Sequence, residues 1–148
     1  GYIEGEFDEY LTTVVNPAPP PATLPADFSN LASFQNTPDW TGSFSLTYTQ
    51  PFAGGQIAFT PSAAYRGDSQ MFEFATPLLD QPAYWLYNAS ITWTSDDDRL
   101  RFGLHGLNLG DEEYRVGGYN FPGALFGNSI IGFYGPPQTF TASVEVRF

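Results

Sequence analysis

The sequence contains no cysteine, and its five basic residues are all arginine. Without thiols, neither disulfides nor thiolate metal sites can form. The formal net charge of −11 disfavours nucleic acid as a partner, because binding a polyanion relies on clustered lysine and arginine. No stretch approaches the roughly 18 consecutive apolar residues that a membrane helix needs. The sequence therefore predicts neither a helical membrane span nor a nucleic-acid partner.

Charge is scarce and aromatic residues are abundant. Charged residues make up 14% of the chain, whereas aromatic residues make up 18%, and soluble domains average roughly 25% charged residues. This mixture is typical of membrane β-barrels, in which alternate strand residues face lipid and the others face a polar interior. The length of 148 residues and the even composition favour a single structural unit over residues 1–148.

Apolar and polar residues alternate along several segments, which predicts β-strands with one apolar face. The clear segments are 40–49, 56–66, 85–94, 99–106 and 139–148, and a weaker one at 1–10 is interpreted as part of a truncated strand. Short turns at 51–55 and 95–98 alternate with long connections at 11–39, 67–83 and 108–137. This alternation is typical of outer-membrane barrels, whose short turns are periplasmic and whose long loops are extracellular.

Aromatic pairs bracket three of these segments at a constant spacing of eight residues, namely Trp40 with Tyr48, Trp85 with Trp93, and Phe140 with Phe148. Eight residues span roughly 26 Å along a strand, or about 20 Å along the membrane normal at a typical tilt. The apolar band of such barrels is roughly 25 Å tall and is edged by aromatic girdles. The spacing favours lipid contact over a soluble core.

Two other classes of protein fit the alternation. A soluble carbohydrate-binding β-domain, built as a sandwich, also has strands with one apolar face, although its loops are typically short. A small autonomous outer-membrane barrel with a structural or adhesive role would need about eight strands that close by themselves. The number of strands and the direction of the apolar face distinguish these alternatives.

A family resemblance rests on short motifs in a characteristic order. Residues 108–115 read Asn-Leu-Gly-Asp-Glu-Glu-Tyr-Arg, and residues 134–140 read Tyr-Gly-Pro-Pro-Gln-Thr-Phe. They resemble the Asn-Leu-Thr-Asp-x-x-Tyr and Gly-x-Pro-Arg-x-Phe segments near the end of TonB-dependent receptors, with Gly110 and Gln138 as departures. Upstream, segments 36–40, 65–68 and 86–89 are also similar to the family.

The resemblance implies an all-β fold, an antiparallel up-and-down transmembrane β-barrel fragment of about six strands from a 22-stranded barrel. It implies a bacterial outer-membrane receptor that imports a scarce nutrient, such as an iron–siderophore complex. The implied partners are outer-membrane lipid, the barrel-assembly machinery, a small-molecule or metal-chelate ligand, and the receptor's own plug domain and TonB. The plug, the TonB-contacting segment and the earlier strands are expected outside this chain.

Three sets of candidate residues follow from the expected strand faces and loops. The polar face, expected toward the lumen and plug, carries Arg66, Arg99, Arg101, His105, Glu145 and Arg147. Ligand contact is assigned to exposed loop aromatics, with loop packing as the ordinary alternative: Phe72, Phe74, Tyr119, Phe121, Phe126 and Tyr134, with Phe133 beside them. The last strand resembles the signal that the assembly machinery reads, through Phe140, Val144, Val146 and Phe148.

The sequence offers little evidence for groups of residues that could catalyse a reaction or bind a metal. His105 is the only histidine and is expected to form hydrogen bonds rather than bind a metal. The acidic turn 96–98 and the acidic run 111–113 are interpreted as solvated segments rather than cation sites. No set of nucleophile, base and acid can be assembled. The sequence therefore predicts no enzyme, no cofactor and no metal, and an extended surface loop for the proline-rich run 16–25.

Overall fold

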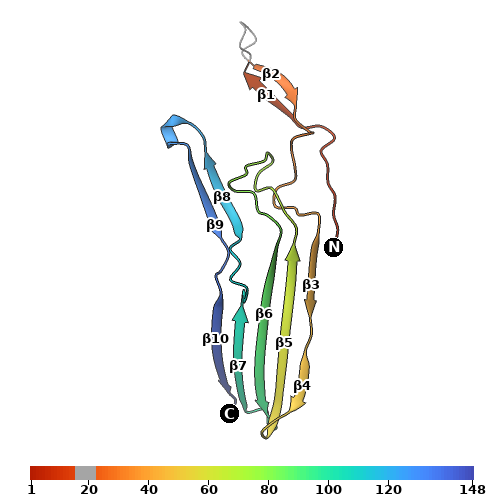
Figure 1. Cartoon of the computed structure of the whole chain (residues 1–148), viewed down its shortest axis with the longest axis vertical. Coiled ribbons are helices and arrows are strands. Elements are labelled where there is room, and N and C mark those ends of the chain that lie inside the picture. Colours follow the sequence, from red (N-terminus) through yellow and green to blue (C-terminus); the bar gives the residue numbers. More distant parts are fainter. Residues whose placement is uncertain (16–22) are drawn as a thin grey trace.

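The computed structural model describes residues 1–15 and 23–148, which form an all-β, antiparallel structure with one short 3-10 helix (Figure 1). The strands are β1 (Leu11–Val15), β2 (Thr23–Asp27), β3 (Thr41–Ser45), β4 (Tyr48–Pro51), β5 (Gly55–Arg66), β6 (Tyr84–Ser95), β7 (Leu100–Leu107), β8 (Arg115–Phe121), β9 (Ser129–Tyr134) and β10 (Thr139–Val146), and the 3-10 helix is η1 (Ala124–Phe126). Across the described residues, no helix is long and apolar enough to cross a membrane. The predicted fold class is confirmed.

The main sheet has the order β10-β7-β6-β5-β3, and β4 also pairs with β5. It is an open sheet, as expected for a fragment of a barrel. Strands β5, β6 and β7 follow one another up and down, and β10 returns beside β7 (Figure 1).

The predicted strand 40–49 is divided into β3 and β4, and Pro61 of the neighbouring strand β5 explains the division. Leu46 N donates to Pro61 O over 3.2 Å, so the ring nitrogen of Pro61, which carries no hydrogen, faces the same neighbour. Proline cannot donate to a strand ladder. The pairing of β5 with this neighbour is therefore interrupted between Ser45 and Tyr48.

Both short turns lie at one end of the sheet, together with the end of β10 (Figure 1). Between β4 and β5, Ala53 and Gly54 have φ angles of 52° and 70°, as in the two-residue turns that match strand twist. Between β6 and β7, Asp98 takes φ 56°. The long connections lie at the opposite end, which confirms the predicted alternation of short and long connections.

The strand register confirms the predicted separation of faces. Ile57, Trp93, Phe102 and Val144 form one row across four strands, through pairs β5–β6, β6–β7 and β7–β10. The next row is Ala58, Thr92, Gly103 and Ser143. Because successive strand residues point to opposite faces, the aromatic and aliphatic row lies on one side of the sheet and the small and hydroxyl-bearing row on the other.

Two of the three long connections contain strands that the sequence interpretation missed. The connection 11–39 includes the hairpin β1–β2, and the connection 108–137 includes β8, η1 and β9. The β8–β9 hairpin carries Val116, Ile130 and Ile131, which suit strand backbone. The expectation of irregular loops was wrong there, whereas the connection 67–83 contains only isolated bridges.

The predicted strand at 1–10 is reduced to its first residues. Tyr2 bridges Trp40, and Ile3 N donates to Asp39 O over 2.9 Å. Beyond this point, Phe7 stacks on Phe34 with ring centroids 4.5 Å apart, so side-chain packing replaces strand pairing. Of the proline-rich run 16–25, residues 16–22 lie outside the described residues, and the rest belongs to β2.

Candidate membrane-facing wall and outer ligand surface

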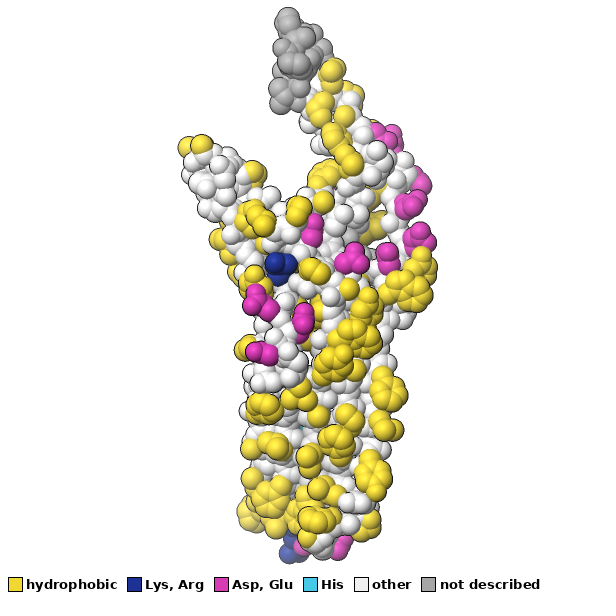
Figure 2. Space-filling model, viewed as in Figure 1, with side chains coloured by type: hydrophobic (Ala, Val, Ile, Leu, Met, Phe, Trp, Pro, Cys, Tyr) yellow, Lys and Arg dark blue, Asp and Glu magenta, His cyan; other side chains and the backbone are white. Residues whose placement is uncertain are grey.

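The apolar face of the main sheet is exposed along its length. Phe44 is 66% exposed, Leu104 52% and Val144 66%. The buried apolar side chains in the described part of the chain, Met71 and Leu79, both lie in the connection 67–83. Figure 2 shows hydrophobic side chains spread over the sheet. A sandwich would bury this face beneath a second layer, and the described residues do not form one.

Aromatic side chains occupy both ends of this face. Near the long connections, Trp85 lies 5.0 Å from Tyr65 and 6.1 Å from Tyr87, measured between ring centroids. Near the short turns, Trp93 lies 5.7 Å from Phe102, and its Nε1 donates to Phe52 O over 2.8 Å. A large apolar ring whose N–H has a hydrogen-bond partner is well suited to the boundary between hydrocarbon and water. The arrangement matches two aromatic girdles for the Trp85–Trp93 pair. The predicted bracket by Phe140 and Phe148 is wrong, because Phe140 pairs with Gly106, the partner of Ala89, midway between Trp85 and Trp93.

On the opposite face, three of the predicted lumen residues come together. Arg101, His105 and Glu145 line a groove of about 310 Å³ together with Thr92, Gly103 and Ser143. Arg101 and Glu145 are direct partners in the β7–β10 pair, and His105 lies between Ser90 and Thr141. The groove therefore places a cation, a carboxylate and an imidazole beside the hydroxyl groups of Thr92 and Ser143, and Val144 also borders it.

The other predicted lumen residues lie nearer the ends of the sheet. Arg147 Nε is 2.7 Å from Glu145 Oε1, and Arg99 Nε is 3.8 Å from Asp97 Oδ2. Arg66, at the outer end of β5, donates from Nη2 to Asn36 O over 2.6 Å. This bond joins β5 to the main chain of the connection 11–39.

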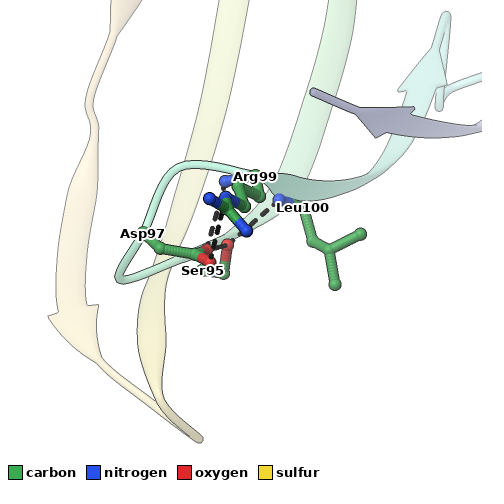
Figure 3. A network of polar contacts seen from close by, with 4 residues as sticks. All are labelled: Ser95, Asp97, Arg99 and Leu100. Carbon is green, nitrogen blue, oxygen red and sulfur yellow. Dashed lines mark hydrogen bonds and ion pairs between the residues drawn. The ribbon is translucent and has the colours of Figure 1, made fainter. Parts of the chain in front are cut away.

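The acidic turn between β6 and β7 is organised by hydrogen bonds (Figure 3). Asp97 Oδ1 accepts from Ser95 Oγ over 2.6 Å and from Arg99 N over 3.2 Å, while Leu100 N donates to Ser95 Oγ over 3.0 Å. The Ser95 hydroxyl, followed by the Arg99 N–H, lowers the pKa of Asp97. No group of three or more potential metal ligands occurs among residues 1–15 and 23–148.

The predicted ligand aromatics separate into two places. Phe74 packs edge-on against Tyr10 and Phe28 at 5.5 and 5.9 Å between ring centroids, and Phe72 lies half-buried in the same connection. The others belong to the β8–β9 hairpin and its tip, where Tyr119 contacts Phe121 and Phe133, Phe121 contacts Phe126, and the Arg115 guanidinium lies 5.9 Å from the centre of the Tyr134 ring.

The connection 67–83 joins the sheet to this hairpin, a role that the sequence did not reveal. Leu79 is 1% exposed, and a Cβ at Gly118 would lie 2.8 Å from it, so β8 approaches it closely. Gln81 Oε1 accepts from Arg115 N over 2.6 Å, and Arg115 Nη1 donates to Asp80 O over 2.9 Å. The hairpin position is thus set by contacts distant in sequence.

Asn108 is a second residue whose role the sequence did not reveal, although its motif was recognised. It is 5% exposed with φ 49°. Its Nδ2 donates to Glu112 O over 2.9 Å and to Pro136 O over 3.1 Å, and its Oδ1 accepts from Glu112 N over 2.9 Å. Asn108 therefore joins the end of β7 to the entry of β10. Asparagine tolerates this left-handed backbone better than most residues.

The last strand carries the residues predicted as the assembly signal. Phe140, Val144 and Val146 are exposed on β10. Phe148 follows the end of the strand, although Arg147 N still donates to Arg99 O over 2.9 Å. The strand ends two residues earlier than predicted.

The family is identified by comparison with known proteins. A family model described as TonB dependent receptor-like, beta-barrel, matches residues 7–109, more than two thirds of the chain. The chain therefore belongs to this family, which confirms the resemblance. The match includes segments 36–40, 65–68 and 86–89, whereas most of the motif at 108–115 lies beyond it. No curated protein and no solved structure matches the chain significantly.

Membership defines the class of protein at a general level. The family comprises outer-membrane receptors and transporters, and it is not a family of enzymes.

Proposed function

We propose that this chain forms the carboxy-terminal strands of a TonB-dependent receptor barrel in a bacterial outer membrane. The apolar face of the main sheet contacts lipid, and the face with Arg101, His105 and Glu145 is turned toward the plug domain. The receptor imports a scarce nutrient, such as an iron–siderophore complex, with energy transmitted through TonB. The remaining strands and the plug belong to other parts of the receptor.

The exposed apolar face with aromatic residues at both ends is the observation that carries this proposal. Large side chains such as Phe44, Phe140 and Val144 are each more than 60% exposed. Transfer of such surface from water to hydrocarbon is favourable by roughly 25 cal/mol per Å². An open sheet of this kind also satisfies its edge strands when further barrel strands pair with them.

The outer part of the chain fits a ligand vestibule. Acidic side chains gather there, away from most of the sheet (Figure 2), and the β8–β9 hairpin presents Tyr119, Phe126 and Phe133 as exposed aromatics. Aromatic side chains with a few polar groups are common in ligand sites. We assign ligand contact to this hairpin in preference to Phe72 and Phe74, since the Phe74 ring packs against Tyr10 and Phe28.

The terminal strand supports a further part of the proposal. Phe140, Val144 and Val146 lie on one face of β10, with Ala142 between the first two, and are exposed, so a machinery that recognises the last strand has an apolar face to bind. Phe148 extends this series.

Single cysteines test the orientation of the sheet, because the chain has no native cysteine. A cysteine at Val144 and one at its neighbour Ser143 are labelled with an environment-sensitive fluorophore in the complete receptor, reconstituted in vesicles with spin-labelled lipid. We expect strong quenching at position 144 and little at 143. Equal quenching at both positions would reject the proposed orientation.

Uptake tests the transport proposal separately. Cells that express the complete receptor are given radioactive ferric iron on a hydroxamate siderophore. Tyr119→Ala combined with Phe133→Ala is expected to reduce uptake, while Leu125→Ala, at the 96% exposed tip, serves as the matched control. Uptake that is the same with and without the receptor rejects this class of substrate.

A further inference from the structure

The acidic residues of the chain are concentrated in segment 1–10 and in the long connections. Of the 16 aspartate and glutamate residues, Asp96, Asp97, Asp98 and Glu145 lie near the short turns, and all the others lie outside the main sheet, where Figure 2 shows acidic side chains gathered. The arginines nearest to that region, Arg66 and Arg115, donate to main-chain carbonyls, and the ion pairs within residues 1–15 and 23–148 both lie near the short turns. The region therefore attracts cations and repels anions.

A groove lies in this region between three segments that are distant in sequence, 4–7, 29–39 and 68–70. It consists of two hollows of about 570 and 170 Å³, which share Gly5, Ser33 and Asp39 and therefore adjoin. Among the described residues, no basic side chain lines this acidic groove, and its carboxylates come from Glu4, Glu6, Asp39 and Asp68. The larger hollow has a volume within the range of roughly 300–1,000 Å³ that is usual for small-molecule sites.

The walls of the acidic groove are held by contacts between these segments. Ile3 N donates to Asp39 O over 2.9 Å, and Asn36 N donates to Gln70 O over 2.9 Å. The Phe7 and Phe34 rings stack at 4.5 Å between centroids, and each lines one of the hollows. Carboxylates beside aromatic rings suit an organic cation, because both attract an ammonium or guanidinium group.

Gln70 adds an observation that does not depend on charge. It lines the smaller hollow, and its Oε1 is buried with no hydrogen-bond partner among the described residues. A buried acceptor without a donor is unfavourable. A ligand with N–H groups supplies a donor at this place, whereas a ligand that carries only acceptors does not.

We propose that the acidic groove binds an ammonium or guanidinium group of the nutrient that the receptor imports, so that this nutrient is a cation rather than an anionic chelate. Asp39 and Asp68 bind the charged group, and Gln70 Oε1 accepts a hydrogen bond from it. The inference rests on the proposed function, because it names the charge of the transported ligand. A bare metal ion is a poorer occupant, since residues 1–15 and 23–148 contain no group of three or more potential metal ligands.

A matched pair of probes tests the groove in the complete receptor without reference to uptake. One probe is cadaverine with one amine joined through an amide to an uncharged boron-dipyrromethene dye, and in the other the free amine is acetylated. Fluorescence anisotropy measures both dissociation constants. We expect the amine to bind about tenfold more tightly at low salt, as for two exposed ion pairs. This advantage should shrink as salt is added, because salt screens exposed charges.

Variants locate the binding. Asp39→Asn combined with Asp68→Asn should weaken amine binding by about three- to tenfold. Asp8→Asn combined with Glu9→Gln removes two charges from exposed positions outside the groove and should change binding by less than about twofold. Gln70→Leu should weaken binding while the midpoint of thermal unfolding stays unchanged or rises, because Oε1 has no partner to lose in the free receptor. A lower midpoint with unchanged binding would overturn the role of Gln70.

The outcomes separate this inference from the proposed function. Equal binding of the two probes, or an equal loss in the two double variants, would overturn the inference and leave the transport proposal intact. Calcium ions that displace the amine at an equal concentration would assign the groove to a metal and overturn it too. In the uptake assay, a ferric trihydroxamate with a pendant ammonium group should be imported faster than its acetylated form, and equal import would contradict the cationic nutrient. Import of neither form would reject the siderophore as substrate, whatever the amine probe shows.

Discussion

The main sheet and the outer part of the chain, which comprises the connections 11–39, 67–83 and 108–137, differ in how their apolar side chains are covered. In the sheet, Phe102 and Val144 remain 46% and 66% exposed, and backbone ladders hold the strands together. In the outer part, Leu79 is 1% exposed and the connection 67–83 is held by its own side-chain bonds. The sheet therefore depends on its surroundings for stability, whereas the outer part contains a small core of its own.

The largest expected effect lies in that small core. Leu79→Ala removes a fully buried side chain and should destabilise the outer part by about 2–5 kcal/mol. Leu78→Ala, at a neighbouring position that is 69% exposed, is the matched control with little effect. Hydrogen exchange of the connection 67–83 and the β8–β9 hairpin measures the difference. Equal protection in both variants would show that the hairpin does not depend on Leu79.

A charge introduced on the outward face should destabilise the receptor slightly less, and this destabilisation depends on the surrounding lipid. Ile91→Arg is expected to destabilise the receptor by about 2–4 kcal/mol in a bilayer. Ser90→Arg places the same charge on the polar face, where water or polar groups can solvate it. Urea unfolding in vesicles measures both variants. If Ser90→Arg proves the more damaging, the assignment of the two faces is reversed.

Asn108 connects the two regions, and its removal should have an intermediate effect. Asn108→Ala leaves the Glu112 N–H and two carbonyls without their hydrogen-bond partner, which should lower the free energy of unfolding by about 1–3 kcal/mol. Asn108→Gly permits the same φ and isolates the contribution of the side chain. Asn120→Ala, at an exposed asparagine of β8, is the control. Thermal unfolding compares the three, and equal midpoints would contradict the role of Asn108.

The smallest expected effect is the pH dependence of the β6–β7 turn. Hydrogen bonds from Ser95 and Arg99 lower the pKa of Asp97 below its ordinary value of 3.8. A carboxyl with a lowered folded-state pKa stabilises the fold above its unfolded value, and this contribution disappears as pH falls through the folded value. In Asp97→Asn, the protection of the β6–β7 turn against hydrogen exchange should therefore change less as the pH falls below about 4. Asp96→Asn is the control, and an equal change there would contradict the assignment.

The strand faces could be predicted from the sequence because each depends only on alternation. Trp93 and Thr92 are neighbours, so their opposite orientations follow from strand geometry without knowledge of their partners. The turns at Ala53–Gly54 and Asp98 were also located correctly. The division between β3 and β4 was missed, because it depends on Pro61 of another strand.

The candidate ligand surface was predicted less well. Phe74 and Tyr119 were both predicted as exposed aromatic residues of long loops, yet Phe74 packs against Tyr10 and Phe28 while Tyr119 lies on a hairpin strand. The hairpin was mistaken for a loop because its strands are rich in glycine. Local composition does not report which residues meet across long sequence separations.

The sequence by itself determined the all-β class, the apolar and polar faces of the sheet, and the family, because strand periodicity and short motifs are local properties. Only the tertiary structure decided that Leu79 lies beneath the β8–β9 hairpin, that Asn108 joins β7 to the entry of β10, and that Phe140 lies level with Gly106 and Ala89. The first two depend on side-chain packing and hydrogen bonds between segments far apart in the chain. The third depends on strand register, which is fixed by the pairing of the whole sheet rather than by neighbours in the chain.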